Sequence, residues 1–276
     1  MAQTKEERQM LFGAIIGDIV GSRFEWHNIK TKQFELFTDR CDFTDDTVET
    51  VAVADALIKA KKNSSDLSTE TIKSLVHFCN AFTGRGYGDL FVHWVAPDNP
   101  HLPYNSYSNG AAMRVSPVGW VVQNLDDIPH LVHAVTAVSH NHPDALHGAE
   151  AVCAAIFLAR TGKTMDEIKS YIHEKYYDIN FTLADIRPNY EYDVSCKGTV
   201  PPALQCFFES TSFEDAIRNA ISIGGDSDTL GAITGSIAEA YYGIPENIIE
   251  QAKGYLYWDL YDVIVEFESL FGNKKD

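Results

Sequence analysis

Residues 224–242 read GGDSDTLGAITGSIAEAYY, and this stretch decides the fold. Small residues interrupt its apolar pattern: Gly231, Ala232, Gly235, Ser236 and Ala238. Glycine inside a helix costs up to about 1 kcal/mol relative to alanine, a cost that is useful only where another backbone must approach closely. We therefore expect a helix over residues 229–242 that lies at the centre of the protein.

The rest of the chain is also helical in pattern, because apolar residues recur at helical spacing and strand-like alternation is scarce. The segments around residues 10–19 and 48–58 show this spacing clearly. Further helices are expected over residues 68–82, 110–122, 128–139, 144–161, 165–175, 197–209, 213–221, 246–252 and 255–271. The stretch from Tyr176 to Val194 lacks periodicity and predicts a long surface connection with a short ordered piece. The fold class is therefore all-α. No Ser/Gly-rich or Pro-rich linker divides the chain, so residues 1–276 are expected to form a single domain.

Composition narrows the range of functions. The formal net charge is −17, from 39 acidic and 22 basic residues, which argues against general nucleic-acid binding because phosphate contacts need a basic surface. The five cysteines are scattered and form no Cys-x-x-Cys pair, so neither a disulfide framework nor a zinc site is expected. Residues 1–8 are too charged for a signal-peptide core, and the longest apolar run, Ala151–Ala159, is too short to span a bilayer. We expect a soluble, cytoplasmic protein without a membrane partner.

Two acidic clusters flanked by hydroxyl groups precede helices near opposite ends of the chain, at residues 44–47 (TDDT) and 224–229 (GGDSDT). Either cluster alone is the ordinary pattern of a helix N-cap. A cap needs one acceptor, however, whereas each cluster offers two carboxylates whose repulsion a bound cation relieves. Oxygen ligands suit hard cations such as Mg²⁺ or Mn²⁺. If the fold brings the clusters together, they predict a two-metal site with these ligands: Thr44, Asp45, Asp46, Asp226, Asp228 and Thr229.

These clusters and the segments between them resemble the ADP-ribosylglycohydrolase family, from about residue 11 to about residue 243. The similar segments are the opening helix and glycine turn (13–22, GAIIGDIVGS), the two metal motifs (43–47, FTDDT, and 223–229, IGGDSDT), two substrate loops (85–88, RGYG, and 105–114, NSYSNGAAMR) and a Ser-His element (139–140). Each motif alone is weak, but together and in this order they are specific.

The resemblance implies a compact orthogonal multi-helix bundle with a binuclear metal cleft that holds two Mg²⁺ ions, with Mn²⁺ as the alternative. It implies a hydrolase that cleaves the glycosidic bond between ADP-ribose and a modified protein side chain or small molecule, and it favours a monomer. Glu25 stands where serine-directed members carry a catalytic glutamate, and Asp46 and Asp226 are the other candidates for acid or base. The implied substrate-binding residues are Gly86, Tyr87, Gly88, Ser106, Tyr107, Asn109, Gly110, Met113 and His140.

Two other functions remain open at this point. A catalytically silent module could bind ADP-ribose or metal with the same residues, and a metal-dependent phosphoesterase could cleave ADP-ribose elsewhere. The acceptor is also open among serine, arginine, a nucleobase, an acetyl ester and a poly-ADP-ribose terminus, although Glu25 and the Ser106–Tyr107 loop look more like the serine-directed branch.

Overall fold

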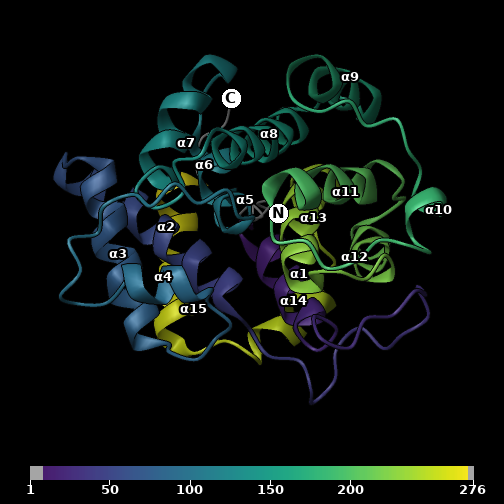
Figure 1. Cartoon of the computed structure of the whole chain (residues 1–276), viewed down its shortest axis with the longest axis horizontal. Coiled ribbons are helices and arrows are strands. Elements are labelled where there is room, and N and C mark those ends of the chain that lie inside the picture. Colours follow the sequence, from purple (N-terminus) through teal and green to yellow (C-terminus); the bar gives the residue numbers. More distant parts are fainter. Residues whose placement is uncertain (1–8, 273–276) are drawn as a thin grey trace, which may run out of the picture.

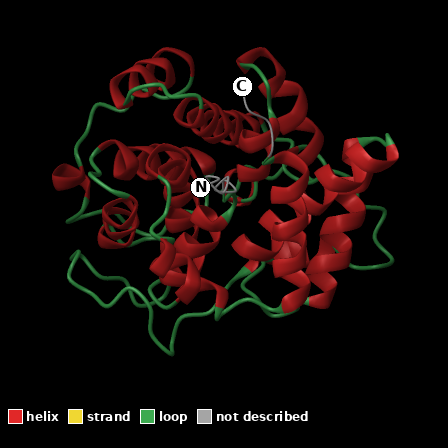
Figure 2. Cartoon of the chain, turned by 180° about the vertical axis from the view of Figure 1, so that it is seen from behind, coloured by secondary structure: helices red, strands yellow, loops and turns green. Residues whose placement is uncertain are grey.

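The computed structural model describes residues 9–272 as helices joined by loops, and no strand occurs within that range (Figures 1 and 2). The elements are α1 (Phe12–Ser22), α2 (Asp45–Asn63), α3 (Leu67–Ala81), α4 (Asp89–Trp94), α5 (Gly110–Met113), α6 (Ser116–Val121), the 3₁₀ helix η1 (Leu125–Asp127), α7 (Ile128–Thr136), α8 (Pro143–Arg160), α9 (Met165–Lys175), α10 (Leu183–Ile186), α11 (Cys196–Phe208), α12 (Phe213–Ser222), α13 (Ser227–Tyr242), α14 (Glu246–Lys253) and α15 (Trp258–Phe271). The all-α prediction is confirmed.

Helices α1 and α13 pack against each other with glycine facing glycine, although they come from opposite ends of the sequence (Figure 1). A Cβ atom added to Gly17 would overlap the backbone of Gly231, and one added to Gly13 would overlap the carbonyl oxygen of Gly235. The two backbones are therefore in direct contact, as only glycine permits. This contact confirms the close backbone approach expected for residues 229–242.

The other helices surround this pair. Helices α8, α11 and α12 pack against α13, while α2 carries α3 and α15 on the opposite side of the molecule. Helix α8 is covered in turn by α6, α7 and α9. The N-termini of α2 and α13 are brought to the same region, and this convergence creates the site described below.

The predicted helix over residues 110–122 is wrong as a single element, because the structure divides it into α5 and α6. Pro117 lies in the first turn of α6 and has no backbone N–H to donate to the carbonyl group of Met113. That carbonyl group instead accepts a hydrogen bond from the Thr50 hydroxyl at 3.4 Å. The break separates the short helix α5 from α6.

Most other predicted helices are present, with ends that differ by a few residues. Helix α4 was not predicted, since six residues are too few for a periodic pattern to be recognised. The predicted surface connection from Tyr176 to Val194 contains α10 as its short ordered piece. The single-domain prediction stays a prediction.

The described residues provide two further observations, one on membrane-spanning helices and one on the cysteines. No helix between residues 9 and 272 is long and apolar enough to cross a membrane. All five cysteines are buried and free. The charged residues 1–8, which argued against a signal peptide, lie outside the described range.

The glycine contact predicts a specific stability defect. The Cβ of Gly231→Ala would meet the carbonyl oxygen of Gly17 and lie 2.8 Å from its carbonyl carbon, so the free energy of unfolding should fall by about 3 kcal/mol. Gly88→Ala is the control, because its Cβ meets nothing within 4 Å, and it should cost less than about 1 kcal/mol. Urea unfolding measures both. Equal stability of the two variants would contradict the proposed contact.

Candidate metal centre

One cavity of about 560 Å³ lies beside the N-termini of α2 and α13. Its volume suits a ligand of nucleotide size. The predicted site residues that line it are Glu25, Asp45, Asp46, Gly86, Gly88, Ser106, Tyr107, Asn109, Gly110, Met113, His140, Asp226, Asp228 and Thr229. Two predicted residues, Thr44 and Tyr87, are not part of the lining. The Tyr87 hydroxyl donates a hydrogen bond to the carbonyl oxygen of Phe82 at 2.9 Å instead.

Carboxylates from separate helices converge beside this cavity. One oxygen atom each of Asp18, Asp46 and Asp228 lie within 4.8 Å of one another, and the same is true of Glu25, Asp226 and Asp228. Asp228 belongs to both groups, so the groups are adjacent. These separations allow three oxygens to share one cation. The two acidic clusters of the sequence therefore do face each other.

The first cluster is anchored by Asp18, which lies inside α1. Its Oδ2 accepts hydrogen bonds from the backbone N–H groups of Thr44 at 2.9 Å and Thr47 at 3.0 Å, and its Oδ1 accepts one from the Thr44 hydroxyl at 2.7 Å. Asp18 thus satisfies free amide groups at the start of α2, a task that a residue of α2 itself usually performs. This cap from a neighbouring helix fixes the start of α2 and, with it, Asp46.

The second cluster depends on a tight turn before α13. Gly224 and Gly225 have φ angles of 71° and 79°, in the left-handed region that favours glycine. The Asn28 side chain holds the turn, since its Oδ1 accepts from the N–H of Gly225 at 2.7 Å and its Nδ2 donates to the carbonyl oxygen of the same residue at 2.9 Å. The turn directs Asp226 and Asp228 toward the first cluster.

Hydrogen bonds from Thr229 and Asn109 also reach these carboxylates. The Thr229 hydroxyl donates to Asp46 Oδ2 at 3.2 Å, and Asn109 Nδ2 donates to Asp226 Oδ2 at 2.7 Å. Asp45 lies against residues 85–88, where a Cβ added to Gly86 would be 2.9 Å from Asp45 Oδ1. Asp18, Asn28, Asn109 and Thr229, from four separate segments of the chain, therefore orient the acidic groups.

The electrostatics of the cluster favour a cation. Burial raises the pKa of Asp46 well above its ordinary value, and the nearby charges of Asp18, Asp45 and Asp226 raise that pKa further. Burial and the charges of Asp226 and Asp46 do the same to the pKa of Asp228. Asp46 Oδ1 is buried without a hydrogen-bond partner among residues 9–272. A buried carboxylate oxygen without a donor is costly, and a divalent ion would satisfy it.

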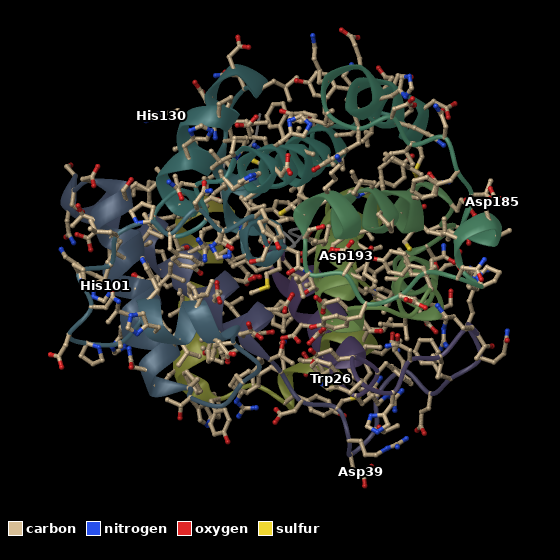
Figure 3. All side chains as sticks on the ribbon, in the orientation of Figure 1. Trp26, Asp39, His101, His130, Asp185 and Asp193 are labelled. Atoms are coloured by element: carbon tan, nitrogen blue, oxygen red, sulfur yellow. The ribbon has the colours of Figure 1, made fainter. Side chains whose placement is uncertain are left out.

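Glu25 lies at the edge of the cavity, in the segment that follows α1. Its Oε1 accepts a hydrogen bond from the Tyr192 hydroxyl at 3.3 Å. Burial, followed by the charge of Asp226, raises the pKa of Glu25 to about 7. The next residue, Trp26, is 71% exposed and stacks on the Tyr192 ring with centroids 5.1 Å apart. Figure 3 labels the chain neighbours of Glu25 and Tyr192, with Asp193 near the middle of the view and Trp26 below it.

Sequence reasoning assigned no role to several residues of the site, among them Asp18, Asn28, Glu49 and Tyr192. Asp18 had a detectable signal, because it is the one charged residue in the apolar pattern of α1. Glu49 lies one helical turn after Asp46 and lines the cavity. Asn28 and Tyr192 lie in loops without periodicity, where only the folded structure shows what they contact.

Several known proteins resemble this chain in sequence or in fold. The ADP-ribosylhydrolase ARH3 of Xenopus tropicalis is 24% identical, over 90% of this chain and 91% of that protein. The human ADP-ribosylhydrolase ARH3 is 22% identical, over 90% and 89%. A solved structure described as an ADP-ribosylglycohydrolase-related protein complex superposes with a TM-score of 0.71 at 20% identity, over 95% of both chains, and shows the same fold.

A family model also matches this chain. The model described as ADP-ribosylglycohydrolase matches residues 3–274, which is nearly the whole chain. The chain therefore belongs to the ADP-ribosylglycohydrolase family, and this membership supports a hydrolase activity on ADP-ribose linkages.

Proposed function

We propose that this protein is a Mg²⁺-dependent hydrolase that cleaves the glycosidic bond between ADP-ribose and a modified protein side chain or small molecule and releases free ADP-ribose. The observation that carries the proposal is the meeting of two acidic clusters around the unpartnered, buried Asp46 Oδ1, beside a cavity of nucleotide size. Family membership supports the ADP-ribose linkage as the target. The monomeric state and the cytoplasmic location stay predictions.

The donor set fits two divalent ions. The proposed ligands are Thr44, Asp45, Asp46, Asp226, Asp228 and Thr229, to which the geometry adds Asp18 as a further carboxylate within reach. All these ligand atoms are oxygens, which suits Mg²⁺ and Mn²⁺ better than softer metals. When bound, such ions supply positive charge that can orient sugar hydroxyls and acidify water.

Glu25 is the proposed general acid or base, with Asp46 and Asp226 as alternatives. Cleavage of a ribosyl bond passes through an oxocarbenium-like transition state, in which the departing acceptor needs a proton and the incoming water must lose one. Glu25 lines the cavity and is only partly buried, so it can exchange a proton with either group. The Tyr192 hydroxyl restricts its orientation through the 3.3 Å hydrogen bond.

The rest of the cavity is proposed to hold the nucleotide. Tyr107 is 54% exposed at the cavity and offers a ring on which adenine can stack. Gly86 and Gly88 line the cavity, and nothing lies within 4 Å of a Cβ added to Gly88, so the backbone there is open to a diphosphate. Asn109 is held by Asp226, so ligand binding and the acidic cluster are linked through one side chain.

Release of ADP-ribose tests the proposed reaction. Serine-, arginine- and nucleobase-linked ADP-ribose would be incubated with the protein in Mg²⁺ or in EDTA, and the products separated by chromatography. We expect free ADP-ribose from at least one substrate, lost in EDTA and reduced about 100-fold or more in Asp228→Asn. Asp39→Asn, an exposed substitution at the periphery in Figure 3, should retain full activity. AMP as the product would favour the phosphoesterase, and no product despite ADP-ribose binding would favour the silent module.

Thermal unfolding tests the metal site separately from activity. In EDTA, Asp228→Asn should unfold at a higher temperature than the wild type, because the substitution removes one of several buried charges that repel. Mg²⁺ should raise the Tm of the wild type by about 5 °C or more and that of the variant much less. If Asp228→Asn unfolds at a lower temperature than the wild type in EDTA, the repulsion is not significant.

The role of Glu25 has its own test. Glu25→Gln keeps the side-chain shape but cannot exchange the proton, so kcat should fall by about 100-fold or more. Glu35→Gln, in the same loop but exposed and outside the cavity lining, is the control and should leave kcat unchanged. Mg²⁺ binding to both variants would be followed by calorimetry. An unchanged kcat for Glu25→Gln, with metal bound, would assign the proton transfer to another group.

A further inference from the structure

A chain of polar groups, buried at its inner end, leads from the interior to the cavity, and the proposed proton transfer does not involve it. It starts at Arg114, whose side chain is fully buried. Arg114 Nη1 donates to Glu49 Oε2 at 2.9 Å, and Nη2 donates to Ser139 Oγ at 2.8 Å. Nη2 also lies 3.3 Å from the carbonyl oxygens of Val135 and Thr136. These four hydrogen bonds, three of them from Nη2, hold the guanidinium in a single orientation.

The Ser139 hydroxyl determines which atom donates in the next hydrogen bond of this chain. A guanidinium only donates, so Ser139 Oγ accepts from Arg114 and keeps its own proton to give away. Among residues 9–272, the contacts of Ser139 Oγ are Arg114 and, at 2.8 Å, His140 Nδ1. If Nδ1 carried the proton, the buried hydroxyl proton would have no acceptor, which is costly. Ser139 therefore donates to Nδ1, and His140 carries its proton on Nε2.

The same assignment of donors and acceptors extends from His140 to the cavity. His140 Nε2 lies 2.9 Å from Ser108 Oγ, which accepts its proton and lies 3.0 Å from Ser106 Oγ. Ser106 Oγ also accepts from the backbone N–H of Ser108 at 3.2 Å. With both acceptor positions of Ser106 directed at Ser108, its own proton points away from Ser108, toward the cavity that Ser106 lines and the Tyr104 hydroxyl beside it.

We propose that Arg114 and Ser139 are positioning residues that hold His140 in its Nε2–H form, so that Ser106 presents a hydroxyl donor to an acceptor atom of the ligand. The ligand atom must then be an oxygen or nitrogen with a lone pair, such as a phosphate oxygen or a ring nitrogen. The inference rests on the proposed function only for the choice of ADP-ribose as ligand.

The surroundings of His140 support a fixed, neutral ring. Gly110 lies against it, since an added Cβ would be 3.0 Å from Nε2. The rings of Tyr104 and Phe91 lie 5.9 Å and 6.2 Å away and limit its rotation. Burial, followed by the charge of Arg114, lowers the pKa of His140 well below its ordinary value. A neutral imidazole has one donor and one acceptor, as the chain requires.

Nitrogen NMR of the imidazole tests the proposal without any ligand. In ¹⁵N-labelled wild type, the His140 signals should show a protonated Nε2 and an unprotonated Nδ1 near neutral pH. His140→Gln identifies those signals by removing them. Ser139→Ala removes the donor to Nδ1, and its spectrum should shift toward the Nδ1–H form. Ser236→Ala, another buried serine whose hydroxyl donates only within α13, should leave the signals unchanged.

Calorimetric titration with ADP-ribose supplies the second readout. Loss of one oriented donor should raise the Kd about tenfold in Ser106→Ala and in Ser139→Ala. Ser139→Thr retains a hydroxyl and should restore both the Nε2–H signal and the affinity, while Ser236→Ala matches the wild type. Circular dichroism confirms that each variant is folded.

Distinct outcomes separate this inference from the proposed function. A wild-type His140 with its proton on Nδ1, or one charged near neutral pH, overturns the chain of donors whatever the enzyme hydrolyses. So does an unchanged Nε2–H signal in Ser139→Ala. Failure of the protein to release ADP-ribose overturns the proposed function, while the NMR result decides the arrangement around His140 independently.

Discussion

Direct contact between the backbones of α1 and α13 is the constraint on which the site depends. Gly17 precedes Asp18, and Gly231 follows Asp228 by three residues, so the carboxylates that meet lie immediately beside the glycines that touch. Gly21 extends the contact, because a Cβ on it would overlap the backbone of Asp228. Any side chain at this crossing would separate the two acidic segments. The small residues of α13 therefore serve the geometry of the site as well as the packing of the core.

The same closeness concentrates negative charge in a buried region. Two unit charges about 5 Å apart repel by about 3 kcal/mol at an effective dielectric constant of about 20. Such repulsion is large compared with the net stability of a protein. The polar groups around the cluster offset part of it: Thr44 and Thr47 donate to Asp18, Thr229 donates to Asp46, and Asn109 donates to Asp226. These donors orient the carboxylates but do not supply the positive charge that the arrangement calls for.

Periodicity in the sequence was sufficient to predict the helical class and most helices, because a long amphipathic pattern reflects burial directly. It failed at residues 110–122, where the missing N–H of Pro117 outweighed apolar spacing. At the site, the two acidic clusters could be found because each is local in sequence. The supporting contacts could not: Asp18 caps a helix other than its own, and Asn28 holds Gly225 from 197 positions away. Contacts between residues so far apart in the sequence produce no local pattern from which they could be predicted.

The placement of the acidic segments has a consequence for synthesis in the cell. Asp46 and Thr229 contact each other although 183 positions separate them, and α13 follows nearly all the other helices along the chain. A growing polypeptide therefore exposes Asp18 and Asp46 on the ribosome long before their partners are made, and α1 has no opposing glycine surface to contact during that time. The first half of the proposed ligand set is therefore incomplete until α13 has been synthesised. Assembly of this protein is a late event, and capture of a divalent ion is expected to coincide with the final stage of folding.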